Sequence, residues 1–216
     1  MHGPISGGPR IYEADITLAM ATKYAEELRK RGYKVVMTRD SDVFVPLETR
    51  VKLARKADAD LFISLHADAG SKSATRGASV YTLSTEGEKR VEAARHKNDW
   101  VLDVEVDSSR PQEVTQILAD LVQRETKNQS ARFAQTLIPA LAEAGWPALE
   151  NTHRKKGFYV LLSPDVPAVL LEMGFITNEQ DAAMMISERK RTALVEGVAH
   201  AIDNFFDSQT RVLASK

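Results

Sequence analysis

The feature that most constrains this sequence is an alternation of short apolar runs with longer segments of helical spacing. Apolar side chains recur three and four residues apart from Ile16 to Arg31, and Gly32 ends that segment. A β-branched run at Tyr33–Thr38, a helical segment at about Pro46–Lys56 and a buried run at Asp60–His66 follow. This alternation favours a mostly parallel sheet with helices on its faces, so we predict an α/β fold.

The second half of the chain repeats these signals after one interruption. Between Thr85 and Arg110 the sequence is strongly charged and weakly periodic, and we interpret this stretch as an insertion. The remaining expected elements are strands at Ala78–Leu83, Phe158–Leu162 and Ala168–Leu171, a long helix from Glu113 to about Ala144 with a break near Asn128, and a last helix from about Glu188 to Phe206.

Length and composition limit the number of domains and the class of function. A chain of 216 residues with 43% hydrophobic residues fits one domain over residues 1–216. Its 29 basic and 30 acidic residues argue against a nucleic-acid partner. No apolar stretch approaches the roughly 20 residues of a transmembrane span, and a signal-peptide pattern is missing, so we expect any export signal to lie outside this sequence.

Ionisable side chains end two of the buried runs. The run Leu61–Leu65 ends on His66, and the run Val169–Leu171 ends on Glu172. Because the carboxyl ends of parallel strands meet at one edge of a sheet, we expect both side chains there. A buried carboxylate such as Glu172 needs a partner, which is a cation, a metal-bound water or a hydrogen-bond donor. The alternative is that Glu172 caps a nearby helix or pairs with an arginine such as Arg50. His66 also fits a core histidine bonded to a backbone carbonyl.

A metal site in this chain must be built from histidines and carboxylates, because the sequence has no cysteine. A catalytic zinc uses three protein ligands and keeps one position open, so a His, Glu, His set with a separate glutamate base would suffice. Glu13 precedes the first helix, where the helix dipole alone would also favour an acid. His153 and Arg154 either face this site or form a solvated pair in a loop.

Three segments resemble the zinc-dependent N-acetylmuramoyl-L-alanine amidases of bacterial cell separation. They read TRDSDVFVPLETRVKLARKADADLFISLHAD (Thr38–Asp68), RGASVYTLS (Arg76–Ser84) and VPAVLLEMGFITNEQD (Val166–Asp181). The likeness extends from Gly7 to about Phe206. It implies a single catalytic domain with a sheet of about six strands, zinc as the cofactor, and peptidoglycan as the substrate. The expected reaction is hydrolysis of the amide bond between N-acetylmuramic acid and L-alanine.

The resemblance also implies roles for individual residues. Zinc in this family is held by a histidine in an N-terminal glycine-rich motif, by a Glu that maps to Glu13 and by a His that maps to His66. The catalytic glutamate maps to Glu172, which we expect to take a proton from a zinc-activated water and deliver it to the leaving amine. We expect His153 or Arg154 to hold the oxyanion or the peptide.

The N-terminus departs from the family pattern. Family members carry a strand and the motif Asp-Pro-Gly-His-Gly-Gly ahead of the zinc-binding Glu, whereas this chain begins Met1–Ile5 and places His2 eleven positions before Glu13. Two interpretations stay open. Either His2 is the first zinc ligand, or that ligand is missing and the protein is a peptidoglycan-binding pseudoenzyme.

The insertion, taken as about residues 85–125, is expected to be regulatory. In the cell-separation amidases a helix here covers the site and supplies a glutamate to zinc until an activator protein removes it. Lys97 stands where that glutamate is expected, so inhibition should act sterically or through His96, Glu92 or Glu113. The resemblance thus implies an activator protein as a partner and a location in the periplasm or cell envelope.

Overall fold

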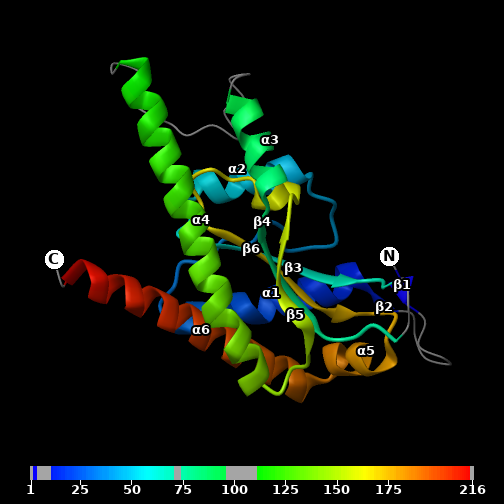
Figure 1. Cartoon of the computed structure of the whole chain (residues 1–216). Helices are drawn as coiled ribbons and strands as arrows, with labels where there is room; N and C mark the ends of the chain where they lie inside the picture. Colours follow the sequence, from blue (N-terminus) through cyan, green and yellow to red (C-terminus); the bar gives the residue numbers. More distant parts are fainter. Residues whose placement is uncertain (1, 4–10, 71–73, 96–110, 215–216) are drawn as a thin grey trace.

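The structure, a computed structural model, describes residues 2–3, 11–70, 74–95 and 111–214. In these residues one four-stranded sheet is surrounded by six α-helices (Figure 1). The strands of the sheet are β3 (Phe62–Asp68), β4 (Ala78–Leu83), β5 (Ala148–Lys156) and β6 (Ala168–Phe175). The helices are α1 (Glu13–Lys30), α2 (Leu47–Lys56), α3 (Thr85–Arg95), α4 (Gln112–Glu143), α5 (Glu179–Ile186) and α6 (Glu188–Ala214).

The sheet has the spatial order β3-β6-β4-β5. The strand β6 pairs parallel with β3 and antiparallel with β4, and β4 pairs parallel with β5. The sheet is therefore mixed but mostly parallel. The predicted α/β class is confirmed, whereas the expectation of about six strands is wrong.

Helices cover both faces of the sheet, as expected. On one face α1, α4 and α6 pack together and against the strands, and on the other face lie α2, α3 and the 3-10 helix η1 (Tyr159–Leu161) (Figure 1). Side chains of β6 alternate between the two layers, since Val169 and Leu171 join the first and Ala168 and Leu170 join the second. The strand β6 is buried on both sides and forms the centre of the domain.

The run Tyr33–Thr38 is not a strand of the sheet. It crosses the end of α1 in an irregular conformation, and Tyr33 is fixed by a 2.8 Å hydrogen bond from its hydroxyl to Asp203 of α6. A cavity of about 700 Å³ is lined by this run and by the outer edge of β3. Neighbouring strands lie about 4.8 Å apart in a ladder, and this run forms no such pairing with β3.

Two further differences concern β5 and η1. The apolar run at Phe158–Leu162 forms η1 rather than a strand, because a short apolar run fits a buried turn as well as a strand. Its Val160 and Leu161 pack on Ala168 and Leu170 of β6. The fourth strand is β5, whose polar sequence ALENTHRKK belongs to an exposed edge of the sheet and lacks the apolar signal.

The expected insertion begins with regular structure. Residues 85–95 form α3, which is mostly charged and is held by Val91 in a small cluster with Val51 and Leu162. The helix α4 is continuous, so the break expected near Asn128 is not formed. At the N-terminus, β1 (His2–Gly3) pairs antiparallel with β2 (Ile11–Tyr12).

None of the helices within the described residues combines the length and apolar character that a membrane crossing requires.

Candidate active site

Three polar side chains form a row across the middle of the sheet. Glu172 on β6 is the register partner of His66 on β3 and of Ser79 on β4. Directly paired residues share a face, so all three lie on the face that carries α2 and η1. The expected meeting of His66 and Glu172 is observed. Neither residue ends its strand, however, because β3 continues to Asp68 and β6 to Phe175.

Glu13 and His66 contact each other directly. Glu13 is the first residue of α1, and its Oε1 lies 3.1 Å from Nδ1 of His66 and accepts a 3.4 Å hydrogen bond from the backbone N–H of Ala67. Burial raises the pKa of Glu13, but the hydrogen bond and charge of His66 outweigh it, so the net pKa is lowered. The site therefore holds an ionised carboxylate beside an imidazole. The other ring nitrogen, Nε2, lies 3.1 Å from the hydroxyl of Ser64.

Glu172 is the most buried acid of this group, with 7% of its surface exposed. Its Oε1 accepts a 2.6 Å hydrogen bond from the backbone N–H of Asp68, which fixes the carboxyl group. Burial raises its pKa to about 7, against the opposing effects of the His66 charge and of that hydrogen bond. A carboxyl group with a pKa near neutrality can both accept and release a proton at physiological pH.

A buried carboxylate holds the end of β6 in place. Asp181, 2% exposed, accepts hydrogen bonds from the backbone N–H groups of Gly77 (2.7 Å) and Phe175 (3.1 Å). Gly174 has a φ of +140°, and a Cβ there would lie 2.7 Å from Oδ2 of Asp181. Glycine is therefore required two residues after Glu172, where β6 passes over this carboxylate.

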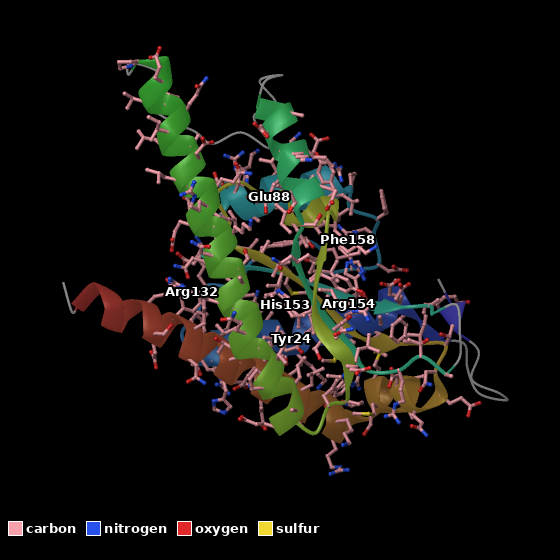
Figure 2. All side chains as sticks on the ribbon, in the orientation of Figure 1. Tyr24, Glu88, Arg132, His153, Arg154 and Phe158 are labelled. Atoms are coloured by element: carbon pink, nitrogen blue, oxygen red, sulfur yellow. The ribbon has the colours of Figure 1, made fainter. Side chains whose placement is uncertain are left out.

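The structure does not bring His153 to Glu172. His153 on β5 is the register partner of Val80, whose side chain packs on the face of α4, and its Nε2 lies 2.9 Å from the hydroxyl of Thr82. The sequence had placed it before a strand at 158–162, whereas it lies inside β5 (Figure 2). Arg154 is exposed, and its Nε donates to the carbonyl of Asn151.

Glu13 and His66 fit two positions of a zinc site. Two ligands with bonds of about 2.1 Å to one tetrahedral zinc lie about 3.4 Å apart. The observed separation of 3.1 Å between Oε1 and Nδ1 is close to that value. Within the described residues no set of three such donors is gathered.

Residues 2–204 match the model of a family described as N-acetylmuramoyl-L-alanine amidase. The chain belongs to this family. It is 31% identical over 215 residues to the amidase AmiC of Neisseria meningitidis serogroup B, covering 95% of this chain and 50% of that protein. It is 32% identical over 206 residues to AmiA of Escherichia coli K12, covering 91% and 70%. The chain thus spans about half the length of AmiC.

Solved amidase structures share the fold. The catalytic domain of the amidase CwlV from Bacillus (Paenibacillus) polymyxa var. colistinus aligns with a TM-score of 0.63 at 25% identity, covering 95% of this chain and 94% of that one. The CwlD amidase of Clostridioides difficile, solved in complex with the GerS lipoprotein, aligns with a TM-score of 0.69 at 17% identity, covering 96% and 92%.

Several residues that were expected to act in the site are placed only in part or lie outside it. The backbone of His2 lies in β1 opposite Tyr12, one residue before Glu13, while its side chain lies outside the described part of the chain. His96 and Lys97 also lie outside it. Glu92 and Glu113 are exposed on α3 and α4, and neither lines the cavity beside Glu13 and His66.

Sequence reasoning missed one polar side chain of this site and expected a different contact for a second. Ser79 is fully buried opposite Glu172, and its hydroxyl has no hydrogen-bond partner among the described residues. The signal was a serine inside the apolar run ASVYTL. Arg50, on the first turns of α2, lines the cavity together with Glu13, Ser64 and His66. The sequence offered Arg50 as a partner of Glu172, whereas in the structure Arg50 donates to the carbonyl of Val45 and Glu172 accepts from the N–H of Asp68.

Proposed function

We propose that this chain is a zinc-dependent N-acetylmuramoyl-L-alanine amidase. It hydrolyses the amide bond that joins N-acetylmuramic acid to L-alanine in peptidoglycan. The observation that carries the proposal is the buried Glu172, with a pKa of about 7, in register with a histidine that contacts Glu13. Family membership supplies the substrate class.

The metal is assigned to His66 and Glu13, whose donor atoms lie at a suitable separation, and His2 is the proposed third ligand. When bound, zinc supplies Lewis acidity, which polarises the scissile carbonyl and makes a water molecule acidic near neutral pH. The lowered pKa of Glu13 keeps its carboxylate ionised for this task. Ser64 orients the imidazole of His66 through its Nε2 atom.

Glu172 carries the proton. Its ionised carboxylate accepts a proton from the attacking water while the Asp68 N–H holds the group in place. The new C–O bond forms, the amide C–N bond breaks, and Glu172 returns the proton to the departing nitrogen. The products are the free carboxyl group of the muramic acid and the free amino group of L-alanine. The burial of Glu172 suits both steps, since its pKa lies near the working pH.

We further propose that the enzyme works in the periplasm or cell envelope and that an activator protein acts on residues 85–125. In Figure 1 α3 and the N-terminal part of α4 extend beyond the sheet, away from β1 and β2. Val114, Ile117 and Leu121 follow one another at helical spacing on α4 and are 40–60% exposed. An apolar stripe of this kind suits a protein partner.

Digestion of dye-labelled sacculi by the purified chain tests the function. The proposal expects dye release, free amino groups on L-alanine among the products, loss of activity with a chelator and recovery with zinc. Bound zinc should approach one ion per chain. Sacculi that are bound but not cut, by a chain that retains no zinc, would instead identify a peptidoglycan-binding pseudoenzyme.

A further inference from the structure

Arg50 is a cation of the cavity wall that forms no ion pair with an acidic side chain in the described part of the chain. Its Nε donates a 3.0 Å hydrogen bond to the carbonyl of Val45, and no acidic side chain of the described residues forms an ion pair with its guanidinium. Arg55, five residues further along the same helix, contrasts with it, because its Nε and Nη2 both bond Oδ2 of Asp165 at 3.0 and 2.7 Å. Among the described residues, the two Nη groups of Arg50 have no acceptor and are available to bind a ligand.

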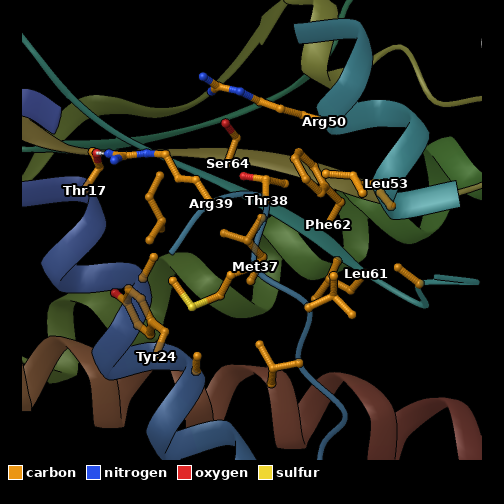
Figure 3. A pocket seen from close by; sticks show the side chains of 18 of the residues that line it. Thr17, Tyr24, Met37, Thr38, Arg39, Arg50, Leu53, Leu61, Phe62 and Ser64 are labelled. Carbon is orange, nitrogen blue, oxygen red and sulfur yellow. Dashed lines mark hydrogen bonds between the residues drawn. The ribbon is translucent and has the colours of Figure 1, made fainter. Parts of the chain in front are cut away.

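Arg50 lies at the polar end of the cavity, next to the proposed metal ligands. The lining of that end includes Glu13, Ser64 and His66, and Figure 3 shows Arg50 there with Arg39 and Ser64. Arg39 is already occupied, since its Nη atoms donate to the carbonyls of Ala14 (2.6 Å) and Ser41 (2.9 Å). Arg39 thus contributes positive charge to this end of the cavity, whereas Arg50 contributes both positive charge and Nη groups that can donate hydrogen bonds to a ligand.

The charge of Arg50 is partly disfavoured at this position. Burial, together with the charge of Arg39, lowers the pKa of Arg50, and the attraction of Glu13 offsets this only in part. Glu13 itself is paired with His66 rather than with Arg50. An anion that fills the polar end of the cavity would relieve this unfavourable charge arrangement, and a guanidinium binds a carboxylate through two parallel hydrogen bonds.

We propose that Arg50 binds a carboxylate of the peptide, adjacent to the amide that is cut. The inference rests on the proposed function, which makes a muramoyl peptide the substrate. A free carboxylate on the residue after L-alanine would lie about 7 Å along an extended chain from the scissile amide. Arg50 then distinguishes this carboxylate from the corresponding carboxamide and is a specificity residue of the amidase.

The test compares two muropeptides that differ only in whether this group is a carboxylate or a carboxamide. Binding is measured by calorimetry on the Glu172→Gln variant, so that neither ligand is hydrolysed. We expect the acid to bind about tenfold more tightly than the amide, as one charge-assisted pair provides. Adding Arg50→Gln should reduce that ratio to about one, and Arg50→Lys should retain part of it.

Lys52→Gln is the matched control, because it removes the same charge from the same helix at a position outside the cavity lining. It should leave the acid preference unchanged, and thermal unfolding of each variant verifies folding. Equal affinity for the two peptides in the parent, absence of binding, or an acid preference that survives Arg50→Gln each overturns the proposal. Since binding is the readout, failure of the chain to cut sacculi would refute the amidase function while leaving the acid preference measurable.

Discussion

Glu172 and His66 are register partners on the parallel strands β6 and β3, and their side chains share one face of the sheet. The proposed proton carrier and a proposed zinc ligand are therefore positioned by backbone hydrogen bonds rather than by a loop. Glu13 joins them from the first turn of α1, which is tied to β3 by its contact with the backbone of Ala67. Such a site keeps its geometry as rigidly as the sheet itself.

The burial of Glu172 should lower the stability of the metal-free protein at high pH. Its pKa is 4.5 in an unfolded chain and about 7 in the fold, so the folded state binds the extra proton between these values. Unfolding free energy should therefore fall as pH rises from about 4.5 to 7, by an amount on the order of 3 kcal/mol.

Glu172→Gln lacks this titration and supplies the comparison. Urea unfolding of chelator-treated protein should give similar stabilities for wild type and variant at pH 4.5, and a more stable variant at pH 8. A difference between the two proteins that is the same at both pH values would contradict the assigned burial of the charge.

His66→Ala should remove zinc, whereas His153→Ala should not. Loss of groups that only orient a metal ligand costs 10- to 100-fold in affinity, so loss of the ligand His66 should cost at least about 100-fold. His153 lies on the opposite face of the sheet, bonded to Thr82. Competition with a chromophoric chelator measures both affinities. If His153→Ala loses zinc as severely as His66→Ala, the placement of the site is wrong.

Gly174→Ala should destabilise the fold by about 2–4 kcal/mol, because strain at positive φ is combined with a clash against a fixed carboxylate. The Cβ would meet Asp181, which is already bonded to two backbone N–H groups. Gly32→Ala is the control, since Gly32 also has positive φ but has open space around it. It should cost only about 1 kcal/mol. If urea unfolding gives the same loss of unfolding free energy for both variants, the Asp181 side chain moves away from the new Cβ without cost, and the prediction is wrong.

The parts of this fold that depend on burial could be predicted from the sequence. The strands β3 and β6 each contain a short apolar run, and both strands were expected from these runs. Helices α1 and α6 show clear helical spacing. The meeting of His66 and Glu172 follows from the same reasoning, because side chains near the ends of parallel strands converge.

The parts that depend on exposure or on distant partners could not be predicted. The strand β5 is polar because it forms an edge, and η1 is apolar although it is a turn. Tyr33–Thr38 has the β-branched and apolar residues of a strand, but it pairs with no described strand and lines a cavity beside β3. The position of Arg50 depends on how α2 packs against η1, and no local pattern in the sequence encodes that contact.

The most direct test of the central claim is stem-peptide release from purified sacculi by Glu172→Gln and Glu172→Ala. Loss of a general base costs about 100- to 10,000-fold in rate, so both variants should fall by that amount while zinc content and the circular dichroism spectrum stay at wild-type values. Release by Glu172→Ala within tenfold of the wild-type rate, with zinc retained, would contradict the role of Glu172 as the group that carries the proton.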